Sequence, residues 1–195
     1  MRPAPWALRA LLHRQGGGNP FLVAESLRAA VAHGILCRDG VGGWQLTPAS
    51  SAEDLGTRVP LTVAVEDLIS QQVAVLGDLA RRMLGAAAIM GLDADAPLLC
   101  AVASVGDGDG LAGLAELFVR ELLSEPRPGT YRLRSEPVRL VTLALLEPGE
   151  ARRMHARAAA ALEALGDPEQ VLGAIAGHHE LAGAPADART FHLRA

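Results

Sequence analysis

Residues 16–36 read GGGNPFLVAESLRAAVAHGIL, and this stretch sets the character of the chain. Asn19 suits the capping position before a helix, and Pro20 suits the first helical position, where a missing N–H costs nothing. Apolar residues then recur at helical spacing as far as Val31, and Gly34 can adopt the left-handed conformation that ends a helix. The stretch therefore predicts an apolar-faced helix entered through a glycine-rich loop.

A short β-hairpin is predicted after this helix. The candidate strands are residues 35–38 and 43–46, and the glycine-rich connection between them can supply the positive φ values of a tight turn. Residues 47–58 are polar, small and acidic, so we expect a linker with little to bury. A domain boundary is therefore predicted after residue 52.

Helices dominate the next part of the chain. Apolar spacing predicts them over residues 61–76, 76–90, 97–103 and 111–122, with a flexible glycine and aspartate connector at 106–110. Tyr131 and Leu133 then alternate with arginines after the turn at Pro126–Gly129, which is typical of a hairpin. Helices followed by a hairpin suggest a winged-helix unit, which we assign to residues 53–147.

The last part is predicted to consist of helical hairpins. Pro137 and Pro148 each open a helix, and two further helices cover residues 168–182 and 186–195 on either side of a short turn. One hairpin of a helical repeat cannot bury its apolar face without a neighbour, so we expect the natural protein to continue beyond Ala195.

The predicted fold class is mainly α. It comprises a helical subdomain with a small β-hairpin over residues 1–52, the winged-helix domain over 53–147, and the start of a TPR-like α-solenoid over 148–195. The composition favours the same class, because aromatic residues make up only 3% of the 195 residues while alanine, leucine, glycine and valine supply the apolar surface.

Lysine is absent, and all 18 positive charges are arginines. This excludes lysine nucleophiles, Schiff-base chemistry and the phosphate-binding lysine of a P-loop. No GxxxxGK[ST] stretch occurs. We therefore expect no ATP hydrolysis by this chain unaided, assign no catalytic residue, and predict that the chain alone is not an enzyme.

The charge and the apolar runs limit the environment of the chain. A net charge of −4 with scattered arginines gives no footprint for tight nucleic-acid binding. The longest apolar runs are well short of the roughly 20 residues of a membrane span, and the N-terminus lacks a signal peptide's apolar core. Cys37 and Cys100 suggest neither a disulfide framework nor a zinc site. A cytoplasmic chain without bound metal is expected.

The order of these pieces resembles the STAND signal-transduction ATPases. Gly18 to Glu25 is similar to the GNPFFVxE block of that family, and Pro148 to Glu163 is similar to its PGExRRxHxRxAxALE helix. VPLTV at 59–63 and YRLR at 131–134 lie between them in the matching order. These are multidomain switches, including maltose-regulator-like and large LuxR-type bacterial transcriptional activators, in which an AAA-type ATPase precedes a winged helix and helical repeats.

The resemblance implies two groups of nucleotide-associated residues. The GxP element, which packs near the adenine in that family, is matched by Gly18, Asn19 and Pro20. The same residues are also accounted for by the start of a helix alone. Ser135 stands where the family usually has a histidine that reports on the bound diphosphate. A serine hydroxyl carries no positive charge, so a charge-assisted contact to phosphate is lost. ATP or ADP and Mg²⁺ belong to the parent family, and no cofactor is expected for this chain alone.

The implied function is that of a regulatory segment in a multidomain ATP-dependent ATPase, acting as an intramolecular switch and interaction module. Its partners would be the rest of its own ATPase and repeat domains, with oligomerisation on activation. Met1 falls in the middle of the family architecture, so a fragment, a mis-started reading frame and a degenerate paralogue all stay open. The inducer and the output domain are not determined by these residues.

Two alternatives remain at this point. The same segment could serve an ATPase with a cyclase or kinase output. The chain could also be a stand-alone winged-helix DNA-binding regulator, but its candidate recognition helix, Gly110 to Leu123, carries Glu116, Arg120 and Glu121 among apolar residues. Two carboxylates on that helix would repel phosphate, whereas DNA readers collect cations on the docking face.

His178, His179 and Glu180 form the most tempting enzyme-like cluster. Adjacent histidines project about 100° apart on a helix and cannot form the i, i+4 pair of a zinc site. We expect His179 to line the apolar face while His178 meets solvent. Glu25 and Glu66 are each expected on a solvated helix face rather than as an acid and base pair.

Overall fold

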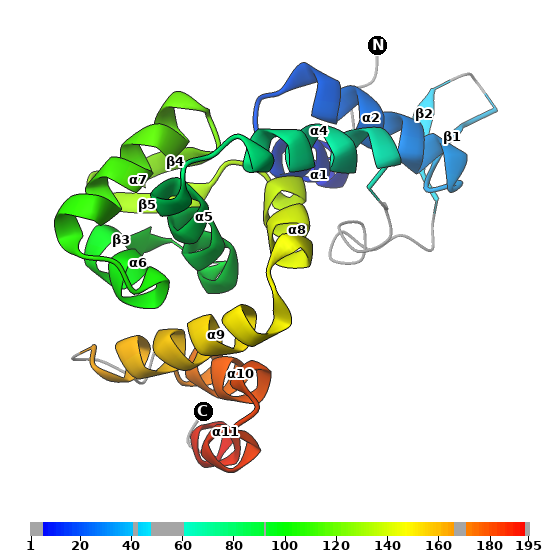
Figure 1. Ribbon diagram of the computed structural model, residues 1–195. Helices are drawn as coiled ribbons and strands as arrows, with labels where there is room; N and C mark the ends of the chain where they lie inside the picture. The colour runs from blue at the N-terminus through cyan, green and yellow to red at the C-terminus, as the bar shows by residue number, and fades with distance from the viewer. Residues whose placement is uncertain (1–5, 41–42, 48–60, 92, 166–170, 194–195) are drawn as a thin grey trace. The chain divides into compact units, whose positions relative to one another are not determined.

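The computed structural model describes residues 6–40, 43–47, 61–91, 93–165 and 171–193, and the chain is mainly helical (Figure 1). It divides into two compact units. The first comprises residues 1–72 and 134–138, and the second comprises 73–133 and 139–195. The mainly α class is thereby confirmed, while the three predicted domain boundaries stay a prediction.

The first unit is built on a helical pair and a hairpin. Its elements are α1 (Trp6–Gly16), α2 (Pro20–Ala32), β1 (Leu36–Arg38), β2 (Trp44–Leu46) and α4 (Val63–Ala74). Asn19 caps α2 as predicted, since its side chain accepts a hydrogen bond from the Phe21 amide at 2.9 Å. Gly34 follows the helix with φ +65°, the left-handed conformation expected of it.

An apolar core closes this unit. The hairpin strands pair antiparallel with Leu36 opposite Leu46 and Arg38 opposite Trp44, so the predicted hairpin is confirmed. Buried side chains from α1, α2 and the start of β1 gather in one cluster: Leu8, Leu11, Ala29, Ala30, Ile35 and Leu36. Burial of this cluster holds the two helices and the hairpin together.

Three helices and a three-stranded sheet form the first part of the second unit. The helices are α5 (Asp78–Met90), α6 (Ala96–Ala103) and α7 (Asp107–Val119), and the strands are β3 (Ala94–Asp95), β4 (Leu123–Arg127) and β5 (Thr130–Leu133). The antiparallel sheet has the order β3-β5-β4. The sequence predicted the β4–β5 hairpin but not β3, which is only two residues long.

The rest of the second unit is a succession of helices. They are α8 (Glu136–Leu145), whose first residues belong to the first unit, then α9 (Pro148–Glu163), α10 (Leu172–Ala182) and α11 (Pro185–His192). Figure 1 shows α10 lying between α9 and α11, and α9 also packs on α5 and α6. Fully buried side chains of this unit include Met83, Leu84, Leu99, Leu117, Met154 and Ile175.

The connector expected at 106–110 is wrong, because α7 already begins at Asp107. Asp107 and Asp109 lie in the first turn, where carboxylates favour the positive end of the helix dipole. Gly110 is needed for packing rather than flexibility, since a Cβ there would lie 2.1 Å from the sulfur of Cys100. Close approach of α7 to α6 therefore explains a glycine that resembled a loop residue.

Within the described residues, no single helix has the length and apolar character needed to cross a bilayer. The helices α6 and α7 reach that threshold only when counted together, and they are bent by 103° at the break between them.

Candidate functional site

The glycine-rich loop before α2 is fixed by its backbone. Gly17 has φ +53° and Gly18 has φ +86°, conformations that other residues adopt only with strain. The Asn19 amide donates to the Gly16 carbonyl at 2.8 Å, which closes the loop onto the end of α1. The entrance to α2 is therefore a rigid turn, with Pro20 as the first residue of the helix.

This loop packs against the segment that follows β5. A Cβ built on Gly17 would lie 2.5 Å from the carbonyl oxygen of Arg134 and 3.0 Å from the Cβ of Ser135. Gly18 has open space around it instead. Gly17, the neighbour of the candidate adenine-binding residues Gly18, Asn19 and Pro20, therefore contacts the candidate phosphate-facing residue Ser135 inside the first unit.

Ser135 is buried and its hydroxyl has no partner. The residue is 5% exposed, and no hydrogen bond to its Oγ is formed within the described part of the chain. A buried hydroxyl without a partner costs free energy, so such a group is expected to meet a water or a ligand atom. The position fits a small polar contact but supplies no positive charge.

A small cavity with both polar and apolar walls lies in the same unit. It is lined by residues of α1, α2, the chain leading into α4, α4 itself and the first turn of α8: Gln15, Leu22, Glu25, Ser26, Leu61, Thr62, Val65 and Pro137. The space open to the centre of a water molecule is about 10 Å³, which is the room one water needs. The cavity therefore suits a single water and is far too small for a nucleotide.

Glu25 organises this cavity, and the prediction that it lies on a solvated face is wrong. It is 8% exposed, and one carboxylate oxygen accepts a hydrogen bond from the Thr62 hydroxyl at 2.9 Å while the other pairs with Arg28. The helical position explains the burial, because Glu25 follows buried Leu22 by three residues and precedes buried Ala29 by four. That spacing was the available signal.

A second feature of the first unit is an open apolar groove. It has a volume of about 630 Å³ and is lined by side chains of α1, α2 and both hairpin strands: Leu8, Leu12, Leu27, Arg28, Val31, Ala32, Leu36 and Trp44. Trp44 is half exposed, and the Arg38 guanidinium carbon lies 5.0 Å from the centre of its ring. Volume and lining are those of a binding surface, which the sequence did not single out.

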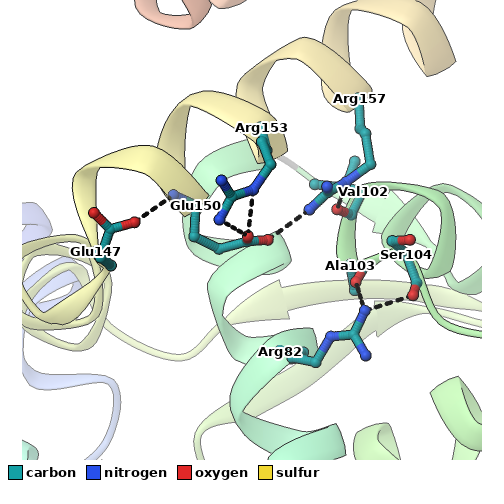
Figure 2. Close-up of polar contacts among 8 residues, drawn as sticks. All are labelled: Arg82, Val102, Ala103, Ser104, Glu147, Glu150, Arg153 and Arg157. Carbon is teal, nitrogen blue, oxygen red and sulfur yellow. Dashed lines mark hydrogen bonds and ion pairs between the residues drawn. The ribbon is translucent and has the colours of Figure 1, made fainter.

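The second unit contains a polar cluster where α9 crosses α6 (Figure 2). Arg157 donates to the Val102 carbonyl at 2.6 Å and to Glu150 at 2.8 Å, and Arg153 pairs with the same carboxylate. Arg82 of α5 donates to the carbonyls of the residues that end α6, namely Ala103 at 2.7 Å and Ser104 at 2.5 Å.

Electrostatics explain what this cluster does. Two arginines satisfy carbonyls at the negative end of α6, which stabilises that helix end. The hydrogen bond from Arg157 holds the pKa of Glu150 below its ordinary value, and Arg153 adds to the effect. Backbone hydrogen bonds from Gly149 and Glu150 likewise lower the pKa of Glu147, the residue that caps α9. The cluster is a structural clamp.

The candidate recognition helix uses its polar side chains internally. The Glu116 carboxylate accepts from the Gly77 amide at 3.2 Å and from Arg120 at 3.2 Å. The structure begins this helix at Asp107 and begins β4 at Leu123, so the predicted range of 110–123 is shifted. Glu116 therefore connects α7 to the start of α5, a contact that the sequence did not reveal.

The prediction that His178 meets solvent is wrong, while His179 is largely covered, with 15% of its side chain exposed. His178 is 8% exposed and its Nδ1 lies 2.9 Å from Nδ1 of His155, and His179 stacks on Phe191 with its Nε2 2.6 Å from Glu163. Ile175 and Ala176 of the same helix are fully buried. The buried face of α10 therefore extends to His178, which the prediction had placed in solvent.

Metal ligands do not converge in the described residues, where no three side chains among histidine, cysteine, aspartate and glutamate form a group able to hold an ion. Comparison of the chain with models of protein families, with curated proteins and with solved structures finds no match.

Proposed function

We propose that the chain is the regulatory segment of a multidomain ATP-dependent signal-transduction ATPase, as its resemblance to the STAND family implies. In this role it acts as an intramolecular switch and an interaction module, without catalytic residues of its own. A LuxR-type bacterial transcriptional regulator is the favoured parent protein.

The observation that carries this proposal is the close approach of Gly17 to Ser135. The resemblance associates the neighbouring Gly18, Asn19 and Pro20 with adenine, and Ser135 with the diphosphate. Both stretches come from distant parts of the sequence, yet the Gly17 position leaves no room for a side chain against Arg134 and Ser135. A contact of this kind is what a shared nucleotide-facing corner requires.

The architecture supports the same proposal. Three helices with the small β3-β5-β4 sheet fit a winged-helix unit, and the succession α9 to α11 fits the start of TPR-like repeats. The apolar groove of the first unit fits a surface that docks another part of the protein, namely the ATPase core that the resemblance implies. A groove of this volume with a mainly apolar lining is typical of binding sites.

Nucleotide binding, on this proposal, needs the missing ATPase core. The small cavity has room for one water, and Ser135 offers a hydroxyl but no charge. Arg28, beside the cavity, is already paired with Glu25. The chain by itself therefore lacks the phosphate cradle that would give ATP measurable affinity.

The first test compares this chain with the longer polypeptide encoded around it. We expect a P-loop upstream and a helix-turn-helix downstream, ATP binding by the longer protein in a fluorescent-nucleotide titration, and none by the 195-residue chain. Light scattering of the longer protein should show ATP-dependent assembly. Turnover of a substrate by the isolated chain, or its tight and salt-dependent binding to duplex DNA, would overturn the proposal.

A further inference from the structure

The helices α9, α10 and α11 are joined by histidines. Four of the six histidines of the chain lie on them, and each contacts a neighbouring helix. The contacts are His155 Nδ1 with His178 Nδ1 at 2.9 Å, His179 Nε2 with Glu163 at 2.6 Å, and His192 Nε2 with Glu180 at 3.0 Å. The first contact differs from the others because neither partner is a carboxylate.

Two imidazoles that face each other through Nδ1 can share only one hydrogen. One ring must donate its Nδ1–H and the other must accept with a lone pair, so at least one ring of the pair has to be neutral. A first added proton keeps this hydrogen bond but places a charge in a site where His178 is 8% exposed. A second proton turns the acceptor into a donor and breaks the bond.

We propose that the His155–His178 contact is an acid-sensitive joint between α9 and α10, which holds the two helices together when the rings are neutral and releases them when both become protonated. The geometry carries this assignment. The rings are 5.2 Å apart between centroids and tilted by 40°, close enough for two imidazolium charges to repel each other strongly.

The charged groups around the joint do not compensate such charges. On α10, His179 bonds Glu163 of α9 and stacks on Phe191 of α11 at 5.4 Å. The α11 residue His192 is bonded to Glu180. In the described part of the chain, no carboxylate forms a hydrogen bond with His155 or His178.

On the other side of α9, where it meets α5 and α6, the Glu150 carboxylate is already paired with Arg153 and Arg157. Arg157 is bonded to Glu150 and to the Val102 carbonyl, and Arg82 bonds the carbonyls that end α6. These charged groups are therefore paired with one another or with carbonyls rather than with the two imidazoles.

The electrostatic consequence has a definite sign. Burial, with the charges of His155 and His179, lowers the pKa of His178 from 6.5 to about 4, and burial also lowers the pKa of His155. Between pH 6.5 and about 4, the folded state therefore binds fewer protons at His178 than the unfolded state does. The stabilisation that depends on neutral His178 is fully present above pH 6.5 and is lost as the pH falls from 6.5 towards 4.

A direct test uses the wild-type chain labelled with ¹⁵N in its histidines. At neutral pH we expect an N–N scalar coupling across the His155–His178 hydrogen bond, and its disappearance on acidification together with faster amide exchange in α10. If both rings titrate independently at their ordinary pKa and the α10 amides keep their protection, the proposal is wrong.

A variant gives the second test, with a matched control. For wild type we expect the unfolding constant of the second unit to rise about 50-fold through this site between pH 7 and pH 4.5, and His178→Asn should remove that part of the rise. His192→Asn, an exposed histidine on α11, should keep the wild-type dependence within about twofold. An unchanged pH profile in folded His178→Asn would overturn the proposal, and failure of this variant to fold leaves the wild-type ¹⁵N experiment decisive.

Discussion

Two adjacent glycines in the loop before α2 are constrained differently, one by backbone conformation alone and the other by close packing as well. Gly17 and Gly18 both adopt positive φ, but only Gly17 faces neighbouring atoms, the carbonyl of Arg134 and the Cβ of Ser135. A methyl group at Gly18 would meet open space. Substitutions at the two positions can therefore distinguish the cost of backbone strain from the cost of steric overlap.

We predict that Gly17→Ala destabilises the chain much more than Gly18→Ala. The φ penalty is common to both and is about 1 kcal/mol, while the overlap of the new Cβ with the Arg134 carbonyl raises the cost at Gly17 to about 3 kcal/mol. Urea unfolding of the two variants measures the difference. Equal losses would mean that the loop does not approach the 134–135 segment closely.

At the scale of elements, α9 is attached to α6 by a side chain as well as by apolar packing. Arg157 links the Glu150 carboxylate with the Val102 carbonyl at the C-terminal end of α6. Arg153 pairs only within its own helix, three residues from Glu150, and its side chain is 63% exposed. Both arginines pair with Glu150, but Arg157 also bonds to α6, so it contributes more to holding α9 and α6 together.

Arg157→Leu is expected to cost about 2 kcal/mol of stability, because it removes a charge-assisted hydrogen bond and leaves a helix-end carbonyl without its partner. Arg153→Leu is the matched control and should cost no more than about 0.5 kcal/mol, as exposed ion pairs within a helix do. Thermal unfolding followed by circular dichroism compares them. A loss for Arg153→Leu as large as for Arg157→Leu would contradict the clamp.

For the whole molecule, acid sensitivity should develop in two separate windows. The histidine joint acts between pH 6.5 and about 4. Carboxylates act lower: a hydrogen bond from Arg132 holds the pKa of Asp93 below its ordinary 3.8, with Arg127 adding to it, and Glu150 is also shifted down. For a lowered carboxyl pKa, the stabilisation is complete above the ordinary value and is lost as the pH falls through the folded value.

Asp93→Asn tests the lower window. The variant should lose about 1 kcal/mol at pH 7, because Asp93 bridges Arg127 of β4 and Arg132 of β5, and the difference from wild type should shrink as the pH falls below about 4. Denaturant titrations at pH 7, 5 and 3 measure it. A difference that vanishes already at pH 5 would assign the stabilisation to another group.

Local chemistry explains how much of the fold the sequence predicts. The helix starts at Pro20 and Pro148, and the β4–β5 hairpin, depend on caps, prolines and turn residues that act over a few positions. The helix predicted from residue 97 begins one residue earlier, at Ala96. The expected loop at 106–110 failed because Gly110 is fixed by the Cys100 sulfur of another helix, which no local pattern contains.

The candidate site divides in the same way. The sequence alone determined a capped helix at Asn19 and Pro20, a chain without lysine and a mainly helical fold, because these follow from residue type and short-range spacing. Only the tertiary structure decided that Glu25 and His178 are buried and that Gly17 meets Ser135. Burial and long-range contacts depend on how helices are rotated and packed against each other. Adjacent residues of a helix project about 100° apart, so a small rotation decides which of them is buried in the core and which is exposed to solvent.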